Sequence, residues 1–387
     1  MSAAGAEGGQ VPLGLLSLGG FATAFGMRML DPLLPMMAVG FGTTVSAVAI
    51  LVAAFMLPYG AGQIATGPLG DRFGKVLVAG LALLLYGAVT VSAIFAETLG
   101  QVGLIRAAGG LAAGAVIPLL MAHVGDSVPY EQRQAAIGKF LTGNVMATLL
   151  AGPISGVLGE HLGWRASFVA GGAMAAGVGA VLLWRLRVAG TKRPARGAAS
   201  AFASYAKLLR APSGRRLLML AAADGALLFG GAFPFVASFL IEDFFLSPAE
   251  AGLVVAGFGL GAFAYTRMAG WLVRRFGERG LLLWGGGGLA VLLMAIALAP
   301  HWGVVLAAQV GCGLAFFMFH GVLQARATEA LPEARGTAVS AFAMALFLGQ
   351  TVGSLVFASV IGVSGYQWAF ALAAIGTAAL GGVAIRR

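Results

Sequence analysis

Gly67-Pro68-Leu69-Gly70-Asp71-Arg72-Phe73-Gly74-Lys75 is a short charged stretch between two long apolar runs. Asp71, Arg72 and Lys75 crowd together, and Gly70 and Gly74 supply the tight backbone geometry of a turn. A basic turn of this length is typical of two membrane-spanning helices that meet at the cytoplasmic surface. The stretch therefore predicts a helical membrane protein.

The composition fits burial in lipid. The 387 residues are 59% hydrophobic and 10% charged, whereas a soluble domain has roughly 25% charged residues. The 61 glycines sit inside the apolar runs, where small residues let membrane helices approach closely. Because a span needs about 20 mostly apolar residues, the sequence predicts an all-α membrane protein with twelve spans, at 12–38, 45–66, 76–95, 99–122, 135–158, 166–186, 216–241, 250–272, 280–299, 302–324, 336–361 and 366–385.

The distribution of charge sets the expected orientation. The net charge of +10 does not indicate nucleic-acid binding, because the basic residues gather between 185 and 216 and in every second loop. Cytoplasmic loops carry this excess of Arg and Lys, so both termini are expected in the cytoplasm. The opposite loops are mainly acidic and hold Glu97, Glu160, Glu242, Asp243 and Glu250.

The cellular setting follows from composition alone. Residues 1–10 are polar and lack a basic region, so no cleavable signal peptide is expected. Abundant Ala and Gly, with Arg preferred over Lys, are typical of a GC-rich bacterial gene. The expected location is the cytoplasmic (inner) membrane of a bacterium.

An internal repeat divides the chain. Residues 67–74 (GPLGDRFG) match 270–277 (GWLVRRFG), and at the same offset 106–111 (RAAGGL) match 309–314 (QVGCGL). The repeat predicts two homologous six-helix bundles, residues 1–187 and 216–387, joined by a basic cytoplasmic linker at 188–215. Parallel repeats of this kind place a transporter's binding site at their interface.

The stretch around Asp71 resembles the signature loop of the major facilitator superfamily. The resemblance rests on Gly67, Gly70, Asp71, Arg72, Gly74 and Lys75, and the second copy is degraded, with Arg274 in place of Asp71. It implies a gating loop that latches the two bundles in one of the alternating states. Asp71 is expected to accept hydrogen bonds from backbone amides at the start of the third helix, whose dipole favours a negative charge.

Two further helices carry the resemblance. The fourth span contains Arg106 in a run similar to the family's intramembrane Arg motif. The fifth contains Gly152, Pro153 and Gly156, followed by Gly163-Trp164-Arg165, and resembles the Gly-Pro motif of proton-driven exporters of the drug:proton antiporter group. The first part of the motif is looser than the family pattern, with Asn144, Ala147 and Leu150 where small residues often stand. For any single glycine, simple helix packing is almost as good an interpretation, whereas the whole run with its Trp-Arg tail is more specific.

Asp31 and Arg106 are the first candidates for proton coupling. Both lie about seven residues from the outer ends of their spans, so at about 1.5 Å per residue they share a depth of about 10 Å. An intramembrane carboxylate favours its neutral form when buried and its charged form beside an arginine, so an Asp31–Arg106 ion pair that moves would exchange a proton. Arg28, three residues before Asp31, is a competing partner. The alternative is a fixed ion pair that locks two helices.

Asp224, in the seventh span, is the third proton-coupling candidate. It lies nearer the cytoplasm, as do His320 and Arg267. An Asp224–His320 contact would form a second proton site, because histidine titrates near neutrality. The alternative is that His320 and Arg267 extend to the membrane interface.

The expected substrate cavity is aromatic and sparsely polar. Such a cavity suits lipophilic or amphiphilic cargo, although aromatic residues at helical spacing more often pack than bind. In a cytoplasmic loop, Asp126, Glu131 and Arg133 resemble another family loop that pairs with its neighbours, or are simply solvated. The residues expected in the cavity are Arg28, Tyr59, Gln63, Asn144, Phe233, His320 and Gln350.

The favoured function is export of small lipophilic or amphiphilic organic compounds by proton antiport through alternating access. The alternative is a gradient-driven facilitator or importer of an organic anion or metabolite, and a third class is a membrane sensor or scaffold. The expected partners are a small-molecule substrate, protons and membrane lipids, with no nucleic acid, and the expected state is a monomer. An enzyme or ATP-driven pump is not expected, because Leu69 and Val76 break the spacing of a phosphate-binding loop. No cofactor or metal is expected, and Cys312 is the sole cysteine.

Overall fold

A computed structural model describes residues 11–189, 201–331 and 335–385. The polar N-terminus and residues 190–200 of the expected linker lie outside this part of the chain. The first half consists of α1 (Leu13–Arg28), the 3-10 turn η1 (Asp31–Leu33), α2 (Leu34–Gly40), α3 (Val45–Val48), α4 (Ile50–Phe73), α5 (Lys75–Val91), the 3-10 turn η2 (Ser92–Phe95), α6 (Leu99–Ala113), α7 (Val116–Ser127), α8 (Tyr130–Leu162) and α9 (Trp164–Ala189).

The second half is also helical over its described residues. It is preceded by α10 (Ala201–Arg210), which lies within the expected linker. It consists of α11 (Pro212–Asp224), the π-helical segment η3 (Gly225–Ala232), α12 (Phe233–Asp243), α13 (Pro248–Ala297), α14 (Trp302–Glu329), α15 (Arg335–Ser364) and α16 (Tyr366–Ile385). Helices suit an apolar chain in lipid because they satisfy every backbone polar group internally.

The described residues contain 11 helical stretches that are long and apolar enough to span a membrane. One of them, α13, has 50 residues and contains a non-helical residue, Gly277, with φ 62° and ψ 179°. A 50-residue helix is about 75 Å long, enough for two spans, so α13 supplies the expected eighth and ninth spans on either side of Gly277. This accounts for the twelve crossings predicted from the sequence.

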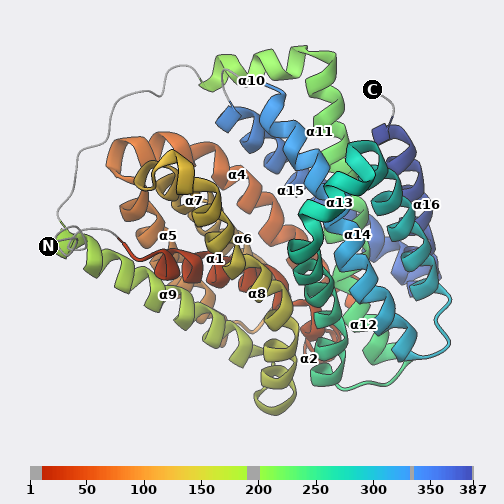
Figure 1. The fold of residues 1–387 in the computed structure, drawn as a ribbon. Helices are drawn as coiled ribbons and strands as arrows, with labels where there is room; N and C mark the ends of the chain where they lie inside the picture. The colour runs from red at the N-terminus through yellow and green to blue at the C-terminus, as the bar shows by residue number, and fades with distance from the viewer. Residues whose placement is uncertain (1–10, 190–200, 332–334, 386–387) are drawn as a thin grey trace, which may run out of the picture.

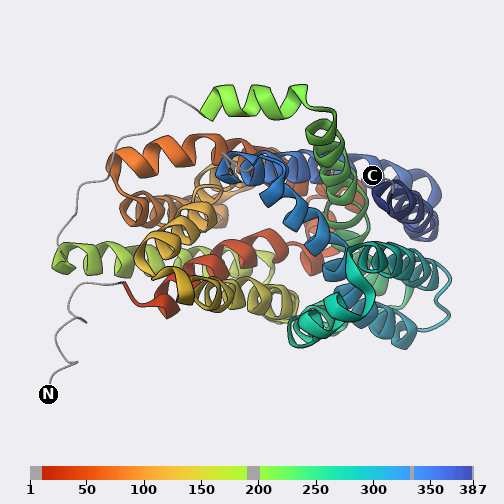
Figure 2. The same cartoon turned by 45° about the horizontal axis from the view of Figure 1, so that its top comes forward.

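The helices form two bundles that lie side by side (Figures 1 and 2). The main contacts between them are α8 with α13 and α4 with α15. Near the end of α8, a Cβ atom added to Gly152 would lie 3.0 Å from the carbonyl oxygen of Gly252, and one added to Gly156 would lie 3.0 Å from Cα of Ala249. The glycines of the fifth span therefore allow the two bundles to pack backbone against backbone.

The charged stretch 67–75 differs from the turn predicted for it. Helix α4 continues through Asp71 to Phe73, and α5 begins at Lys75. Only Gly74 breaks the helix, with φ 99°, a left-handed value that favours glycine. The turn is a single residue because Gly70, which was expected to bend the chain, is helical and instead lets Leu119 approach closely.

The Gly156→Ala substitution tests the close contact between α8 and α13. The new methyl group would overlap backbone atoms of Pro248 and Ala249, and overpacking of this kind costs about 1–3 kcal/mol. We expect a lower midpoint of thermal unfolding in detergent, followed by intrinsic tryptophan fluorescence. Gly138→Ala is the matched control on the same helix, because no atom lies within 4 Å of its added Cβ. Equal midpoints for the two variants would contradict the packing account.

Candidate functional site

The first span is interrupted where its charged residues lie. Pro32 and Pro35 have no N–H to donate to the carbonyl groups four residues earlier, and the chain passes from α1 through η1 into α2. Arg28, the last residue of α1, and Asp31, the first of η1, form an ion pair at 3.6 Å between Nη1 and Oδ2. Asp31 is only 4% exposed, so this pair is held inside the bundle rather than at a surface.

A pocket between the two bundles contains this ion pair. Arg28 and Asp31, together with Thr148 and Gly152 of α8, form its wall on the first half. The hydroxyl of Thr148 donates to the carbonyl oxygen of Asn144, so its proton is already used within α8. The ionic groups on this side of the pocket are therefore Arg28 and Asp31.

The opposite wall comes from the second half and is mainly aromatic. Phe229, Phe233, Phe258 and Gln309 line it, and the ring centroids of Phe233 and Phe258 lie 4.7 Å apart. The guanidinium carbon of Arg28 lies 4.0 Å from the centroid of Phe229, within the range of a cation–π contact. Arg28 thus joins a carboxylate of its own half to an aromatic ring of the other.

Arg106 does not take the position expected for it. The ion pairs within the described residues join Asp31 to Arg28 and not to Arg106. Arg106 donates from Nη1 to the carbonyl oxygen of Gly26 at 2.8 Å and from Nε to that of Leu51 at 3.3 Å. Carbonyls in the last turn of a helix lack intrahelical partners, and Arg106 satisfies one where α1 ends. Its Nη2 is buried without a hydrogen-bond partner.

A second buried ionisable pair lies in the other half. Nδ1 of His320 on α14 lies 2.6 Å from Oδ2 of Asp224, the last residue of α11. The Asp224–His320 contact, one of the two alternatives that the sequence allowed, is therefore present. The other alternative, in which His320 extends to the membrane interface, is not what the structure has. The ring of His320 also stacks on Phe316, with centroids 4.8 Å apart.

The other residues expected in the cavity lie away from this pocket. Tyr59 packs edge to face against Phe347 of α15, with centroids 4.6 Å apart, and so joins the two halves elsewhere. Gln63 and Gln350 are buried on α4 and α15. Asn144 faces Gly20 of α1 within the first bundle, and its Oδ1 is buried without a hydrogen-bond partner. Contacts of these residues with substrate remain a prediction.

The signature stretch is tied to its own bundle. Nζ of Lys75 pairs with Asp126 at the end of α7, as expected if the 126–133 loop pairs with its neighbours. No hydrogen bond from the start of α5 to Asp71 is found in the described part of the chain, because α4 carries Asp71 as a helical residue before the break at Gly74.

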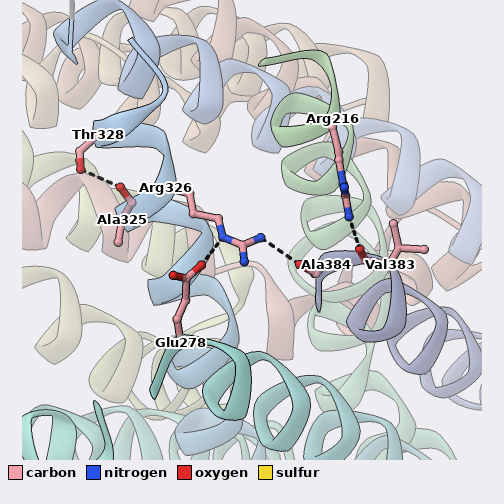
Figure 3. A network of polar contacts seen from close by, with 7 residues as sticks. All are labelled: Arg216, Glu278, Ala325, Arg326, Thr328, Val383 and Ala384. Atoms are coloured by element: carbon pink, nitrogen blue, oxygen red, sulfur yellow. Dashed lines mark hydrogen bonds and ion pairs between the residues drawn. The ribbon is translucent and has the colours of Figure 1, made fainter. Parts of the chain in front are cut away.

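The second half repeats this contact with the charges exchanged. Glu278 follows Gly277 as Lys75 follows Gly74, and it accepts from Nε of Arg326 on α14 at 2.5 Å. Figure 3 shows Arg326 also donating to the carbonyl oxygen of Ala384, beside the contact of Arg216 with Val383. Each half therefore joins the residue that opens its third span, Lys75 or Glu278, to the C-terminal end of its fourth span.

Sequence reasoning missed parts of the pocket wall. Phe258 and Thr148 were not proposed as site residues, because nothing in their spacing separates them from packing residues. Gln309 could have been found, since it is the repeat counterpart of Arg106. It is 1% exposed, and its Nε2 is buried without a hydrogen-bond partner. Within the described residues there is no group of three or more His, Cys, Asp and Glu side chains that could hold a metal ion.

Comparisons with known proteins cover nearly the whole chain. A sequence model described as Major Facilitator Superfamily matches residues 16–241 and 218–386. An uncharacterized MFS-type transporter of Bacillus subtilis, YwfA, is 28% identical over 359 residues, which is 91% of this chain and 85% of that protein. A crystal structure of a mutant of the nucleoside transporter NupG has a TM-score of 0.78 with 14% identity, covering 97% of this chain and 100% of that one.

Shorter matches include proteins named for their compounds. A chloramphenicol resistance protein of Pseudomonas aeruginosa is 32% identical over 177 residues, 44% of this chain and 41% of that protein. A gallate transporter of Pseudomonas putida is 25% identical over 162 residues, 42% of this chain and 36% of that protein.

Arg106→Lys tests whether this arginine holds helices together. A lysine keeps the charge but presents one compact ammonium group, which cannot reproduce the two bonds to Gly26 and Leu51. We expect the free energy of unfolding in detergent to fall by about 1–3 kcal/mol. Arg267→Lys is the control, because its exposed guanidinium contacts only the Phe263 ring, at 5.0 Å, among the interactions described. An Arg106→Lys protein as stable as the wild type would contradict the assignment.

Proposed function

The chain belongs to the Major Facilitator Superfamily, and on this premise we propose that it is a proton-coupled antiporter that exports small lipophilic or amphiphilic organic compounds. It is a multi-pass membrane protein and a transporter. The proton coupling, the direction and the cargo class are the proposal. We place it in a bacterial cytoplasmic membrane, as a monomer with both termini in the cytoplasm.

The observation that carries the proposal is the buried Arg28–Asp31 pair in a pocket between the two halves. A carboxylate inside a membrane is costly unless it is paired or protonated. When Asp31 takes up a proton, its attraction to Arg28 is lost, so that Arg28 is no longer held in place over Phe229 of the opposite half. Proton binding at Asp31 therefore changes how strongly one half holds the other. Arg106, through its unpartnered Nη2, is the second cation proposed to act on this carboxylate.

The pocket favours a cargo with aromatic character. Phe229, Phe233 and Phe258 offer ring faces and edges, and aromatic contacts add about 0.5–1.5 kcal/mol beyond burial of area. The unpartnered Nε2 of Gln309 can donate to an acceptor on the cargo. A relative named for chloramphenicol resistance agrees with compounds of this class.

The alternating movement is proposed to use residues 1–187 and 216–387 as two rigid bundles. In the structure they meet where α8 ends and α13 begins, and Oε2 of Glu160 accepts from the backbone N–H of Ala249 at 3.1 Å. With cytoplasmic termini this contact lies on the outer side, which is then closed. Gly152, Pro153 and Gly156 would open and close that contact. Residues 67–75 would latch the inner side in the opposite state.

An organic anion moved together with a proton is the second candidate. Arg28 offers a positive charge inside the pocket, and once Asp31 is protonated that charge is free to meet a carboxylate. A relative named as a gallate transporter agrees with such a cargo. The two functions predict opposite directions of proton movement relative to cargo.

Asp31→Asn tests the proposal in proteoliposomes that hold a pH-sensitive dye. We expect wild-type protein to carry protons in the direction opposite to chloramphenicol or tetraphenylphosphonium. In Asp31→Asn this proton flux should be at least about tenfold lower, because the amide cannot exchange a proton. Asp243→Asn is the control, since Asp243 lies at the end of α12 and accepts from Gln367 at 2.7 Å.

Two results would contradict antiport at Asp31. One is normal proton flux through Asp31→Asn. The other is 4-hydroxybenzoate moving in the same direction as protons while the two lipophilic probes do not move at all, which would establish the anion alternative.

A further inference from the structure

The Asp224–His320 pair is isolated within the second half. Asp224 is fully buried, with 0% exposure, and one of its oxygens, Oδ1, has no hydrogen-bond partner. The other oxygen meets Nδ1 of His320 at 2.6 Å. The repeat counterpart of Asp224 is Phe21, so the first half has no equivalent carboxylate, and the pair is not a remnant of the symmetry.

Few other charges act on this pair. Neither α15 between residues 336 and 364 nor α16 carries a charged side chain. On α13, Arg267 is exposed and lies over Phe263, and Tyr265 approaches α14 near Gly321. The remaining charged groups on these helices lie toward helix ends or beside the break at Gly277: Arg215 and Arg216 on α11, Glu242 and Asp243 on α12, Arg326 and Glu329 on α14, and Glu250, Arg274, Arg275, Glu278 and Arg279 on α13.

The protonation states of the pair differ in net charge. A carboxylate beside a neutral imidazole carries one negative charge, a single shared proton brings the pair to zero, and a second proton makes it positive. In an apolar interior the neutral state is favoured over either charged state. The pair can change its net charge only by exchanging a proton with water. His320 has a partly exposed side chain, at 12%, through which that exchange can occur.

The position of the pair connects it with the pocket. Asp224 precedes the π-helical segment η3, which contains Phe229, and π-helical turns occur frequently at functional sites. Phe316 stacks on His320 and meets Phe229 edge to face with centroids 4.6 Å apart. A change at the pair is thus two ring contacts away from the ring that Arg28 touches.

We propose that Asp224 and His320 form a second proton-binding site, carried by the second half and separate from the Arg28–Asp31 pair. The proposal rests on the proton-coupled transport proposed above and deepens it: each half carries one exchangeable proton, and a full cycle moves two. The second site contacts the pocket wall through Phe316 but does not line the pocket, so cargo and this proton do not compete for the same atoms.

A count of protons on the purified, full-length protein in detergent tests the second site without any cargo. The protein is taken from about pH 8 to about pH 5, the range in which histidine titrates, in weakly buffered solution, and the acid consumed is compared among variants. We expect Asp31→Asn to take up about one proton fewer than wild type, and Asp31→Asn/Asp224→Asn/His320→Gln to take up about one fewer again.

The amide pair Asp224→Asn/His320→Gln keeps a polar pair of similar size that can still form a hydrogen bond. If the native contact were only structural, this variant would fold, keep its unfolding midpoint and consume as much acid as the wild type, and that result would overturn the proposal. If the pair variant fails to fold, spectroscopy of the wild-type protein tests the site instead. The infrared band of the Asp224 carboxyl group is assigned with Asp224→Asn, and the ¹⁵N resonance of the His320 ring with His320→Gln. The proposal predicts that both signals change with pH. Signals that do not respond to pH overturn the site.

This count is independent of the transport test. A normal proton flux through Asp31→Asn would defeat coupling at Asp31 while leaving the proton count at Asp224 and His320 unaffected. Loss of flux in Asp31→Asn with no proton assigned to the pair would leave the antiport proposal standing and remove the second site.

Discussion

The ion pair between Arg28 and Asp31 is the interaction on which the rest of the site depends. Two ionised groups inside an apolar bundle are stable only if they satisfy one another, and the structure meets that need at the point where prolines interrupt the first span. The interruption between α1 and η1 leaves backbone carbonyl groups at the end of α1 without helical partners. It also places Arg28 and Asp31 beside each other. Arg106 satisfies the carbonyl of Gly26, so the same interruption explains both the pocket and the contact between α1 and α6.

The packing of the two halves serves this site. Glycines on α8 and α13 bring the backbones into contact near the end of the pocket, with Gly152 both lining the pocket and facing Gly252. On the far wall, Phe229 meets Arg28 across the interface. The charged pair, the aromatic wall and the glycine contact therefore lie where the two halves meet, which is the arrangement expected if proton binding and the proposed movement are linked.

Much of this architecture could be predicted from the sequence. The apolar runs predicted the spans, since each is long and apolar enough to cross a membrane, and the repeat predicted the two bundles. The helical course of residues 67–73 could not be predicted, because glycine permits a turn without requiring one. The choice of Arg28 over Arg106 as the partner of Asp31 also depends on three-dimensional packing. Depth arithmetic placed Arg106 within reach of Asp31, and helical spacing placed Arg28 there, but Arg106 donates to the carbonyl oxygens of Gly26 and Leu51 instead. The π-helical segment before Phe233 has no sequence signal that we can identify.

The central claim is that Asp31 exchanges a proton while it remains buried beside Arg28. Infrared difference spectroscopy of the purified protein between low and high pH measures that event directly, because a protonated carboxyl group has its own C=O stretching band. The account predicts a band that appears on acidification in the wild type and is missing from the Asp31→Asn protein. Identical difference spectra for the two proteins between about pH 5 and 9, a range above ordinary carboxyl titration in which carboxyl groups buried in apolar sites titrate, would contradict it.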